Sequence, residues 1–218
     1  MGTTLSPLAV KLLDSLGASL ASEALEIGGG IALWHYSPHR QTNDIDLWWS
    51  EASDLAAEAI ERSVVEVTGA EGLDWMERVQ QGYPSWDLKS NGKTVFAIQV
   101  AVKRVQIYAP VASRWGHLKL ETLAENVANK MCALVQRAAP RDFVDIATLL
   151  KGSAISPQEC WRLWQLKNPQ GELKQAKVHL LKGLGGLTAR RPIDSIQDLE
   201  ERIRASETRD LISKLAQV

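Results

Sequence analysis

Two aspartates separated by one apolar residue, Asp44 and Asp46, are the part of this sequence best suited to hold a metal ion. Side chains alternate between the two faces of a β-strand, so a strand from Asp44 to Trp49 would place both carboxylates on one face. Ile45 and Leu47 would then turn into the core. Carboxylates, together with substrate phosphates and water, are the ligands that Mg²⁺ takes in proteins. The pair therefore predicts a site for Mg²⁺ or Mn²⁺.

Three consecutive glycines, Gly28 to Gly30, precede the aspartates and are followed by the helix-compatible run IALWHY. Glycine lets backbone N–H groups approach an anion closely, and the N-terminus of a helix favours negative charge. Arg40 and Thr42 stand just before the acids. We therefore take Gly29, Gly30, Arg40 and Thr42 as candidate phosphate-binding residues. A triple glycine alone is more often an ordinary loop.

A second group of polar residues follows the helical pattern expected from Leu118 to Arg137. A step of about 100° per residue gathers the apolar residues of this segment on one stripe, with Asn126, Lys130 and Arg137 at its edge. An ammonium or guanidinium group in that position could neutralise triphosphate charge. The alternative is that Lys130 and Arg137 only extend from a core helix.

The next helix is expected to begin at Pro140, a residue suited to the first helical position. Asp142 would then stabilise the exposed N–H groups of the first turn. Asp145 shares the core side of this helix with Ile146 and Leu149. A buried acid needs a partner, and Lys130, Arg137 and Arg141 are the candidates.

The segments GGIAL and HRQTNDIDL, followed by AENVANKMCALVQRAAPRDFVDIATLL at residues 124–150, resemble the motifs of a known family. These are the AbiEii-type toxin nucleotidyltransferases of prokaryotic toxin–antitoxin and phage-defence systems, within the polymerase-beta-like superfamily. The resemblance covers roughly residues 20–150. It implies an α+β fold with a mixed sheet flanked by helices and a helical C-terminal region. It also implies that Lys130 and Asp145, with Asp142 second, take part in catalysis and that Arg137 binds the nucleotide.

One position departs from the superfamily pattern. Polymerase-beta-like enzymes generally carry a third carboxylate on the strand beside the Asp-x-Asp pair. The matching strand here, Val95 to Val102, has Gln99 at its centre, and an amide cannot ionise. Either Asp145 or another acid such as Asp87 supplies that function, or the protein is catalytically impaired.

The resemblance further implies transfer of a nucleoside monophosphate from an NTP to an RNA acceptor, with the 3′ end of tRNA as the expected site, by a toxin that a cognate antitoxin restrains. Two other functions stay open. One is a small-molecule nucleotidyltransferase, and the other is a silent protein that only binds a nucleotide.

Charge is unevenly distributed along the chain. Residues 151–191 contain eight Lys or Arg and two Glu, whereas residues 1–150 contain thirteen basic and eighteen acidic side chains. A basic extension beside an acidic catalytic region suits an enzyme that holds a nucleic-acid backbone. The alternative is a solvated helix face. We expect a nucleotidyltransferase core at residues 1–118 and a helical region at 119–218.

Composition fits a cytoplasmic enzyme. Of the 218 residues, 45% are hydrophobic and 23% charged, and no apolar run reaches the roughly 18 residues of a membrane span. The N-terminus lacks the features of a signal peptide. The two cysteines, Cys132 and Cys160, do not make a disulfide framework.

The remaining elements are expected from local patterns. Helices are predicted at residues 6–25, at 53–63 with Ser53 as the cap, and from Leu118 onward. Strands are predicted at residues 64–69, 86–90 and 94–109, with a hairpin turn at Asn91-Gly92. Trp48, Trp49, Trp161 and Trp164 could stack on a base, although burial in the core is the more frequent role of tryptophan.

Overall fold

The computed structural model describes residues 4–49, 51–80 and 82–218. The chain divides into two compact units, residues 1–126 and 127–218. The first unit contains the whole sheet and the second is helical, so the α+β class expected from the sequence is confirmed. The division at residues 118 and 119 expected from the sequence stays a prediction.

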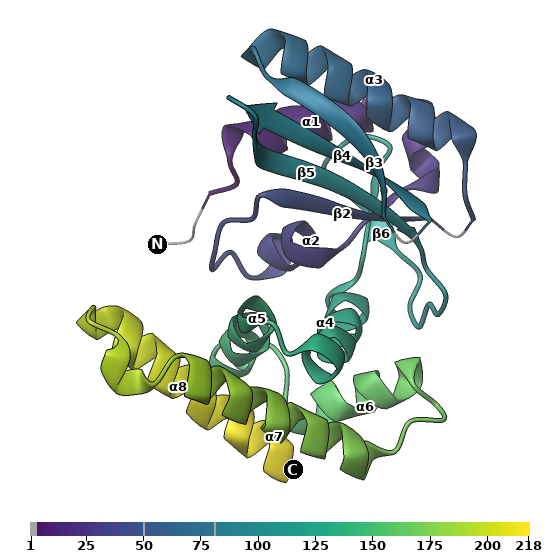
Figure 1. Cartoon of the computed structure of the whole chain (residues 1–218). Helices are drawn as coiled ribbons and strands as arrows, with labels where there is room; N and C mark the ends of the chain where they lie inside the picture. The colour runs from purple at the N-terminus through teal and green to yellow at the C-terminus, as the bar shows by residue number, and fades with distance from the viewer. Residues whose placement is uncertain (1–3, 50, 81) are drawn as a thin grey trace. The chain divides into compact units, whose positions relative to one another are not determined.

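The first unit is a seven-stranded mixed sheet with helices packed on it (Figure 1). The strands follow the order β3-β4-β5-β2-β1-β7-β6, in which the pairs β1–β7 and β2–β5 are parallel. The strands are β1 (Glu26–Ile27), β2 (Asp44–Trp49), β3 (Asp74–Gln80), β4 (Tyr83–Ser90), β5 (Lys93–Val102), β6 (Val111–Ala112) and β7 (Lys119–Leu120). The helices are α1 (Pro7–Gly17), the 3₁₀ helix η1 (Leu20–Ala24), α2 (Gly29–Tyr36) and α3 (Asp54–Glu71).

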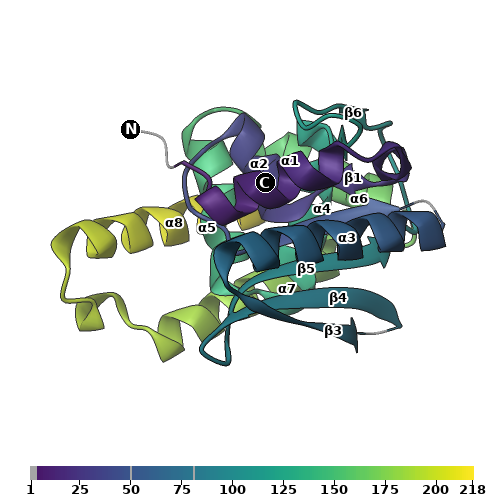
Figure 2. The same ribbon diagram turned by 90° about the horizontal axis from the view of Figure 1, so that it is seen from above.

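The core of this unit lies between the sheet and the neighbouring helices α1 and α3, which run side by side in Figures 1 and 2. Burial alternates along β2, where Ile45, Leu47 and Trp49 are buried in this core. The intervening residues of β2 face the other side of the sheet, where the first turn of α2 lies against them. Since a strand presents alternate residues to opposite faces, core packing on one side fixes the orientation of the polar side chains on the other.

The N-terminal helix is shorter than expected from the sequence. It ends at Gly17 rather than at residue 25, and Leu20, inside the expected range, is 67% exposed. A Cβ on Gly17 would overlap the backbone carbonyl of Trp115. The helix thus ends where the backbone at Trp115 comes close to Gly17.

The strand expected at residues 64–69 is wrong, because these residues continue α3. The run VVEVTG is rich in β-branched residues, which favour strands. Its buried members, Val64, Val67 and Thr68, nevertheless extend the helical spacing set by Ala56 and Ile60. Packing of this continuous stripe overrides the local preference. The expected cap is confirmed, since the Ser53 hydroxyl accepts a hydrogen bond from the Ala56 N–H at 3.3 Å.

The predicted hairpin at Asn91-Gly92 is confirmed, with positive φ at both residues between β4 and β5. Beyond it, β5 ends at Val102, short of the expected residue 109. The helix expected from Leu118 begins only at Leu123, because residues 119 and 120 form β7 in parallel pairing with β1. The strand β3 was not foreseen.

The second unit is helical and its core lies among its own helices. α4 (Leu123–Arg137) begins in the first unit and continues into the second; it is followed by α5 (Pro140–Lys151), α6 (Pro157–Lys167), α7 (Leu173–Arg190), the 3₁₀ helix η2 (Ile193–Ser195) and α8 (Leu199–Gln217). α8 packs against both α5 and α7. Trp161 and Trp164 are buried in this unit with their rings edge to face at 6.0 Å, and Trp161 Nε1 donates to the Leu215 carbonyl. These two tryptophans therefore serve packing.

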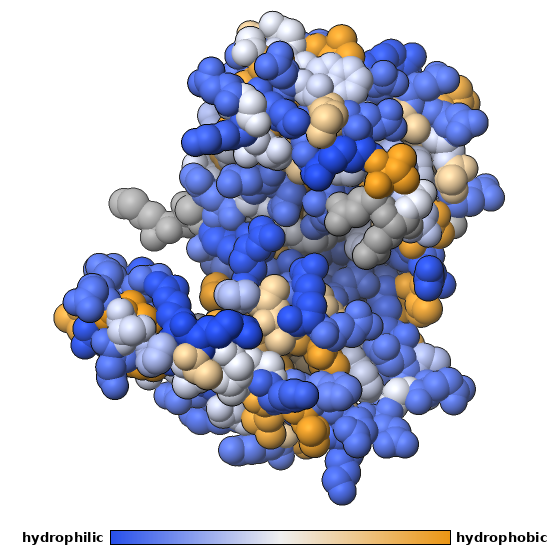
Figure 3. Space-filling view, viewed as in Figure 1, coloured by the Kyte–Doolittle hydropathy of each residue, from blue (hydrophilic) through white to orange (hydrophobic). Residues whose placement is uncertain are grey.

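Within the described part of the chain, none of the helices is both long enough and apolar enough to span a membrane. The face seen in Figure 3 is mostly hydrophilic, with apolar residues in small separate patches.

Candidate functional site

The polar face of β2 carries Asp44 and Asp46, both half-buried, with Ile45 and Leu47 buried between and beyond them. Thr42, which is buried, donates a short hydrogen bond from its hydroxyl to the Asp44 carboxylate. A half-buried carboxylate pair on one strand face is held in orientation by the core packing behind it. The carboxylates can therefore present oxygens to a common ligand.

The glycine turn lies directly against this face. The Gly28 N–H donates to the Asp46 carbonyl at 2.8 Å, and α2 begins at Gly29. A Cβ on Gly28 would overlap the Trp48 indole, and one on Gly29 would overlap the Asp46 carboxylate. Gly29 also has φ +54°, which disfavours residues with a Cβ. The glycines thus allow the N-terminal backbone of α2, with its partial positive charge, to sit beside the aspartates.

Gly29→Ala is expected to damage both stability and activity. Alanine at this position must adopt a left-handed backbone conformation, at a cost of about 1–2 kcal/mol. Its methyl group must also displace the Asp46 carboxylate. We expect a lower free energy of urea unfolding and at least a tenfold fall in nucleotide turnover. The matched control is Gly69→Ala on α3, where a Cβ would meet no atom within 4 Å. Equal activities of the two variants would contradict the close fit at Gly29.

The other candidate phosphate-binding residues lie at the same turn. A Cβ built on Gly30 would come within 2.8 Å of the Thr42 hydroxyl and 3.6 Å of an Arg40 guanidinium nitrogen. The structure thus brings together Gly29, Gly30, Arg40 and Thr42 beside the aspartates, although each residue's role toward a nucleotide stays a prediction.

The strand beside β2 carries the departure noted in the sequence. Asp46 pairs in register with Gln99 of β5, so both side chains lie on the same sheet face, and Gln99 is exposed. Asp87, the substitute acid, lies one strand further, in register with Ala97, which pairs with Asp44. It is buried and ion-paired with Arg78, and it accepts a hydrogen bond from Thr94 at 3.3 Å. The Asp87 carboxylate is therefore already engaged by Arg78 and Thr94, which is a structural role.

The side chains at the β2 face fit a metal ion that would take its remaining ligands from substrate and water. Among the described residues no group of three or more His, Cys, Asp or Glu side chains is placed to hold a metal. Asp44 and Asp46 would be the residues that hold such an ion, a role that stays a prediction. Mg²⁺ commonly binds through one or two carboxylates together with substrate phosphates and water.

A buried charge cluster behind the glycine turn was missed by sequence reasoning. Lys103, only 5% exposed, forms ion pairs with Glu26, Glu121 and Glu125. Glu125 accepts the backbone N–H groups of residues 107 and 108 at 2.9 and 3.0 Å. Local sequence patterns do not identify partners so far apart in the chain, since Lys103 and Glu26 are separated by 77 positions.

This cluster is joined to the glycine turn by Asn126. Its side-chain amide donates to the Gly29 carbonyl at 3.1 Å and to the Glu121 carboxylate at 2.8 Å. Asn126 Oδ1 and Trp48 Nε1 are both buried without a hydrogen-bond partner among the described atoms. The network therefore fixes the carbonyl side of the turn from behind.

Glu121 is expected to make stability depend on pH. Its burial raises the pKa of the carboxyl above 4.5, while Lys103 and Asn126 oppose the shift. The folded state then holds this proton more tightly than the unfolded state, so its contribution to stability is lost as pH rises through the raised pKa. Replacing Glu121 by Gln removes this dependence. The free energy of urea unfolding of Glu121→Gln minus that of the wild type should therefore be larger at pH 8 than at pH 5.

The control for this measurement is Glu58→Gln, an exposed residue of α3. Its stability difference from the wild type should be the same at both pH values. A Glu121→Gln difference that is also independent of pH would contradict the raised pKa of Glu121.

In the second unit, two ion pairs join α4 to α5. Lys130 Nζ lies 2.8 Å from the Asp145 carboxylate, which is fully buried, so the partner expected for Asp145 is found. Arg137 donates from Nε and Nη2 to both oxygens of Asp142, at 2.8 and 3.0 Å. This fork geometry is typical of arginine–carboxylate pairing. Asp44 and Asp46 belong to the first unit, so catalytic roles for the α4 and α5 residues stay predictions.

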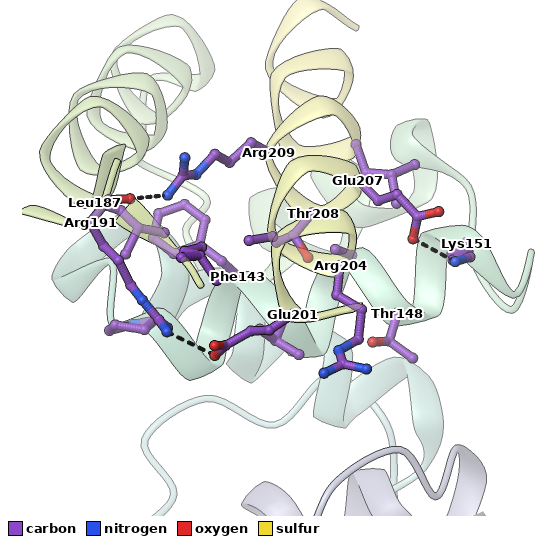
Figure 4. Close-up of a pocket in the computed structure, with 16 residues that line it drawn as sticks. Phe143, Thr148, Lys151, Leu187, Arg191, Glu201, Arg204, Glu207, Thr208 and Arg209 are labelled. Atoms are coloured by element: carbon purple, nitrogen blue, oxygen red, sulfur yellow. Dashed lines mark hydrogen bonds and ion pairs between the residues drawn. The ribbon is translucent and has the colours of Figure 1, made fainter. Parts of the chain in front are cut away.

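A pocket of about 340 Å³ lies among α5, the end of α7 and α8 of the second unit (Figure 4). Its charged side chains are engaged with one another: Lys151 with Glu207 and Arg191 with Glu201. Arg209 donates to the Arg191 carbonyl, and the buried Phe143 also lines the pocket. These contacts tie α5 and α7 to α8.

The α+β sheet with a glycine turn against two strand aspartates is the arrangement of a nucleotidyltransferase. A similar fold occurs in the crystal structure of a candidate nucleotidyltransferase from H. pylori, with a TM-score of 0.58, 15% identity, and coverage of 97% of this chain and 96% of that one. A nucleotidyltransferase-like antigenic protein from Paracoccidioides brasiliensis gives a TM-score of 0.39 at 18% identity, covering 90% and 94%. No curated protein matches the chain.

Residues 11–215 match the family model described as nucleotidyl transferase AbiEii toxin of type IV toxin–antitoxin systems. The chain therefore belongs to the AbiEii nucleotidyltransferase toxin family, as the sequence motifs predicted. The match extends well beyond residues 20–150, so the C-terminal helices are part of the family's architecture.

Proposed function

We propose that this AbiEii-family toxin transfers a nucleoside monophosphate from a metal-bound NTP to an RNA acceptor, namely the 3′ end of tRNA. The observation that carries the proposal is the face of β2, where Asp44 and Asp46 lie against the glycine turn that begins α2. One side of this arrangement offers carboxylate oxygens and the other offers backbone N–H groups. Carboxylates bind the metal and N–H groups at a helix N-terminus favour the phosphates, so the arrangement suits a metal–triphosphate complex.

The reaction is an in-line displacement at the α-phosphorus. A hydroxyl oxygen of the acceptor forms the new bond, the bond to the bridging oxygen of the β-phosphate breaks, and pyrophosphate leaves while the hydroxyl proton is released to solvent. Mg²⁺ or Mn²⁺ held by Asp44 and Asp46 would supply charge neutralisation along the triphosphate. Arg40 and the N–H groups at Gly29 and Gly30 would bind the outer phosphates.

The RNA acceptor is supported by the charge of the C-terminal helices. Residues 151–191, which form α6 and α7, carry the excess of basic side chains noted in the sequence. Basic helices supply the phosphate contacts that dominate affinity for nucleic acids. Family membership supports restraint by a cognate antitoxin, and the low cysteine content supports action in the cytoplasm.

Gln99 favours one alternative, a nucleotide-binding protein that is catalytically silent. It lies in register beside Asp46, where the superfamily generally has an acid. A small-molecule nucleotidyltransferase is the other alternative. Each of the three functions gives a different result in a single assay.

The test is incubation with Mg²⁺ and each α-labelled NTP in turn, with total tRNA in one arm and an aminoglycoside in another. The proposal expects label on tRNA. Label on the aminoglycoside alone would instead establish a small-molecule enzyme. Retention of NTP on the protein without any transfer would establish a silent binding protein.

A further inference from the structure

α7 carries basic side chains but no acidic ones. Its residues from Leu173 to Arg190 include three lysines, one arginine and one histidine, and no acidic residue. Amphipathic surface helices commonly mix both signs of charge, which pair at spacings of three and four residues. An 18-residue helix without an acid offers its own cations no ion-pair partner within the helix.

One face of α7 forms a shallow groove with the end of α4. The groove encloses about 630 Å³, and its lining contains basic but no acidic side chains. The lining residues are Val135, Gln136, Arg137, Ala138, His179, Lys182, Gly183, Gly186 and Arg190. The spacing of the last five along α7 places them on a single side of that helix.

The cations of this groove differ in their partners. Arg137 is bonded to the buried Asp142 carboxylate. His179, Lys182 and Arg190 are exposed, and in the described part of the chain none of them lies within ion-pair distance of an acid. These three side chains are free to bind phosphate.

Two glycines of α7, Gly183 and Gly186, line the groove without adding side chains to it. A Cβ on Gly183 would overlap the Ala138 side chain, so this glycine lets the two segments approach closely. Gly186 has only an Arg190 guanidinium nitrogen nearby, at 3.5 Å from a built Cβ. Glycine is unfavourable in a helix interior, yet here it leaves helix backbone bare between basic side chains. A bare floor with basic walls fits the close approach of a sugar–phosphate backbone.

We propose that the groove between the end of α4 and α7 binds the phosphodiester backbone of the RNA acceptor through Lys182, Arg190 and His179. This inference rests on the proposed function, because it identifies the surface of the second unit that contacts the backbone of the same RNA acceptor. Contacts of this kind position a nucleic acid without reading its sequence.

The test measures RNA binding directly, without turnover, by fluorescence anisotropy of labelled tRNA on the full chain. Lys182→Glu/Arg190→Glu should raise Kd at least about tenfold, and the slope of log K against log salt should become shallower by about 1–2. The matched control is Lys174→Glu, an exposed lysine of α7 outside the groove. A labelled DNA strand of equal length tells whether the groove accepts either backbone or RNA alone.

Equal Kd values for the wild type and Lys182→Glu/Arg190→Glu would overturn the proposal that the groove binds RNA. The same conclusion would follow if the loss of affinity per charge changed were equal in the double variant and in Lys174→Glu. Absence of RNA binding by the wild type would also overturn the proposal. Transfer of α-label from NTP is followed in parallel. Groove-dependent binding without transfer refutes the proposed function and keeps the groove, whereas transfer with groove-independent binding does the reverse.

Discussion

Asp44→Asn/Asp46→Asn is expected to reduce nucleotidyl transfer by at least about 10³-fold while the protein stays folded. The two carboxylates lie on the polar face of β2, and the residues that secure the fold there are Ile45, Leu47 and Trp49 on the opposite face. Asparagine retains shape but removes the charge that a divalent cation requires. Loss of metal-assisted charge stabilisation costs several kcal/mol in the transition state. Initial rates with saturating Mg²⁺ and α-labelled NTP provide the measurement.

The control is Asp74→Asn, an exposed aspartate of β3. It has the same chemical change on the same sheet and should leave the rate within about twofold of the wild type. Near-wild-type transfer by Asp44→Asn/Asp46→Asn, with unchanged circular dichroism, would show that these two residues take no part in the reaction.

Lys130→Met is expected to destabilise the protein by about 3–5 kcal/mol. The Asp145 carboxylate is fully buried and lies 2.8 Å from Nζ of Lys130, whose side chain is 10% exposed. Removing one partner of a buried ion pair leaves the other charge in a poorly solvated position. Lys130→Met/Asp145→Leu should recover most of the loss, because neither charge is then buried alone. Urea unfolding followed by tryptophan fluorescence gives the free energies.

Lys151→Met is the matched control. Lys151 pairs with Glu207 across α5 and α8, but both side chains are largely exposed, at 63% and 45%. Exposed pairs contribute about 0–1 kcal/mol, so this variant should unfold almost as the wild type does. A loss of under 1 kcal/mol in Lys130→Met would show that Lys130 is not needed to neutralise Asp145 in the folded protein.

The chemistry-bearing face of β2 could be predicted from the sequence because its signals are local. Strand alternation places Asp44 and Asp46 on one side, and Gly28 to Gly30 stand a short distance upstream. The Lys130–Asp145 pair was also within reach, since helical spacing put Asp145 on a core face that demands a cationic partner.

The remaining features depend on contacts that sequence spacing does not encode. The β-branched run at residues 64–69 indicated a strand, yet its side chains complete a buried helical stripe of α3. Lys103 meets Glu26 from 77 residues away, because β1 and the end of β5 flank β2 in the sheet. Sheet order set that contact, and the sequence predictions placed only the strand from Val95 to Val102 beside the strand of Asp44 and Asp46, not β1 on its other side.

The most direct test of the account compares α-labelled with γ-labelled NTP in one reaction with Mg²⁺ and tRNA. Transfer at the face of β2 predicts α-label on the RNA and γ-label in free pyrophosphate, with both signals lost in Asp44→Asn/Asp46→Asn. The appearance of γ-label on the acceptor, or of transfer that survives in Asp44→Asn/Asp46→Asn, would contradict nucleotidyl transfer at this site.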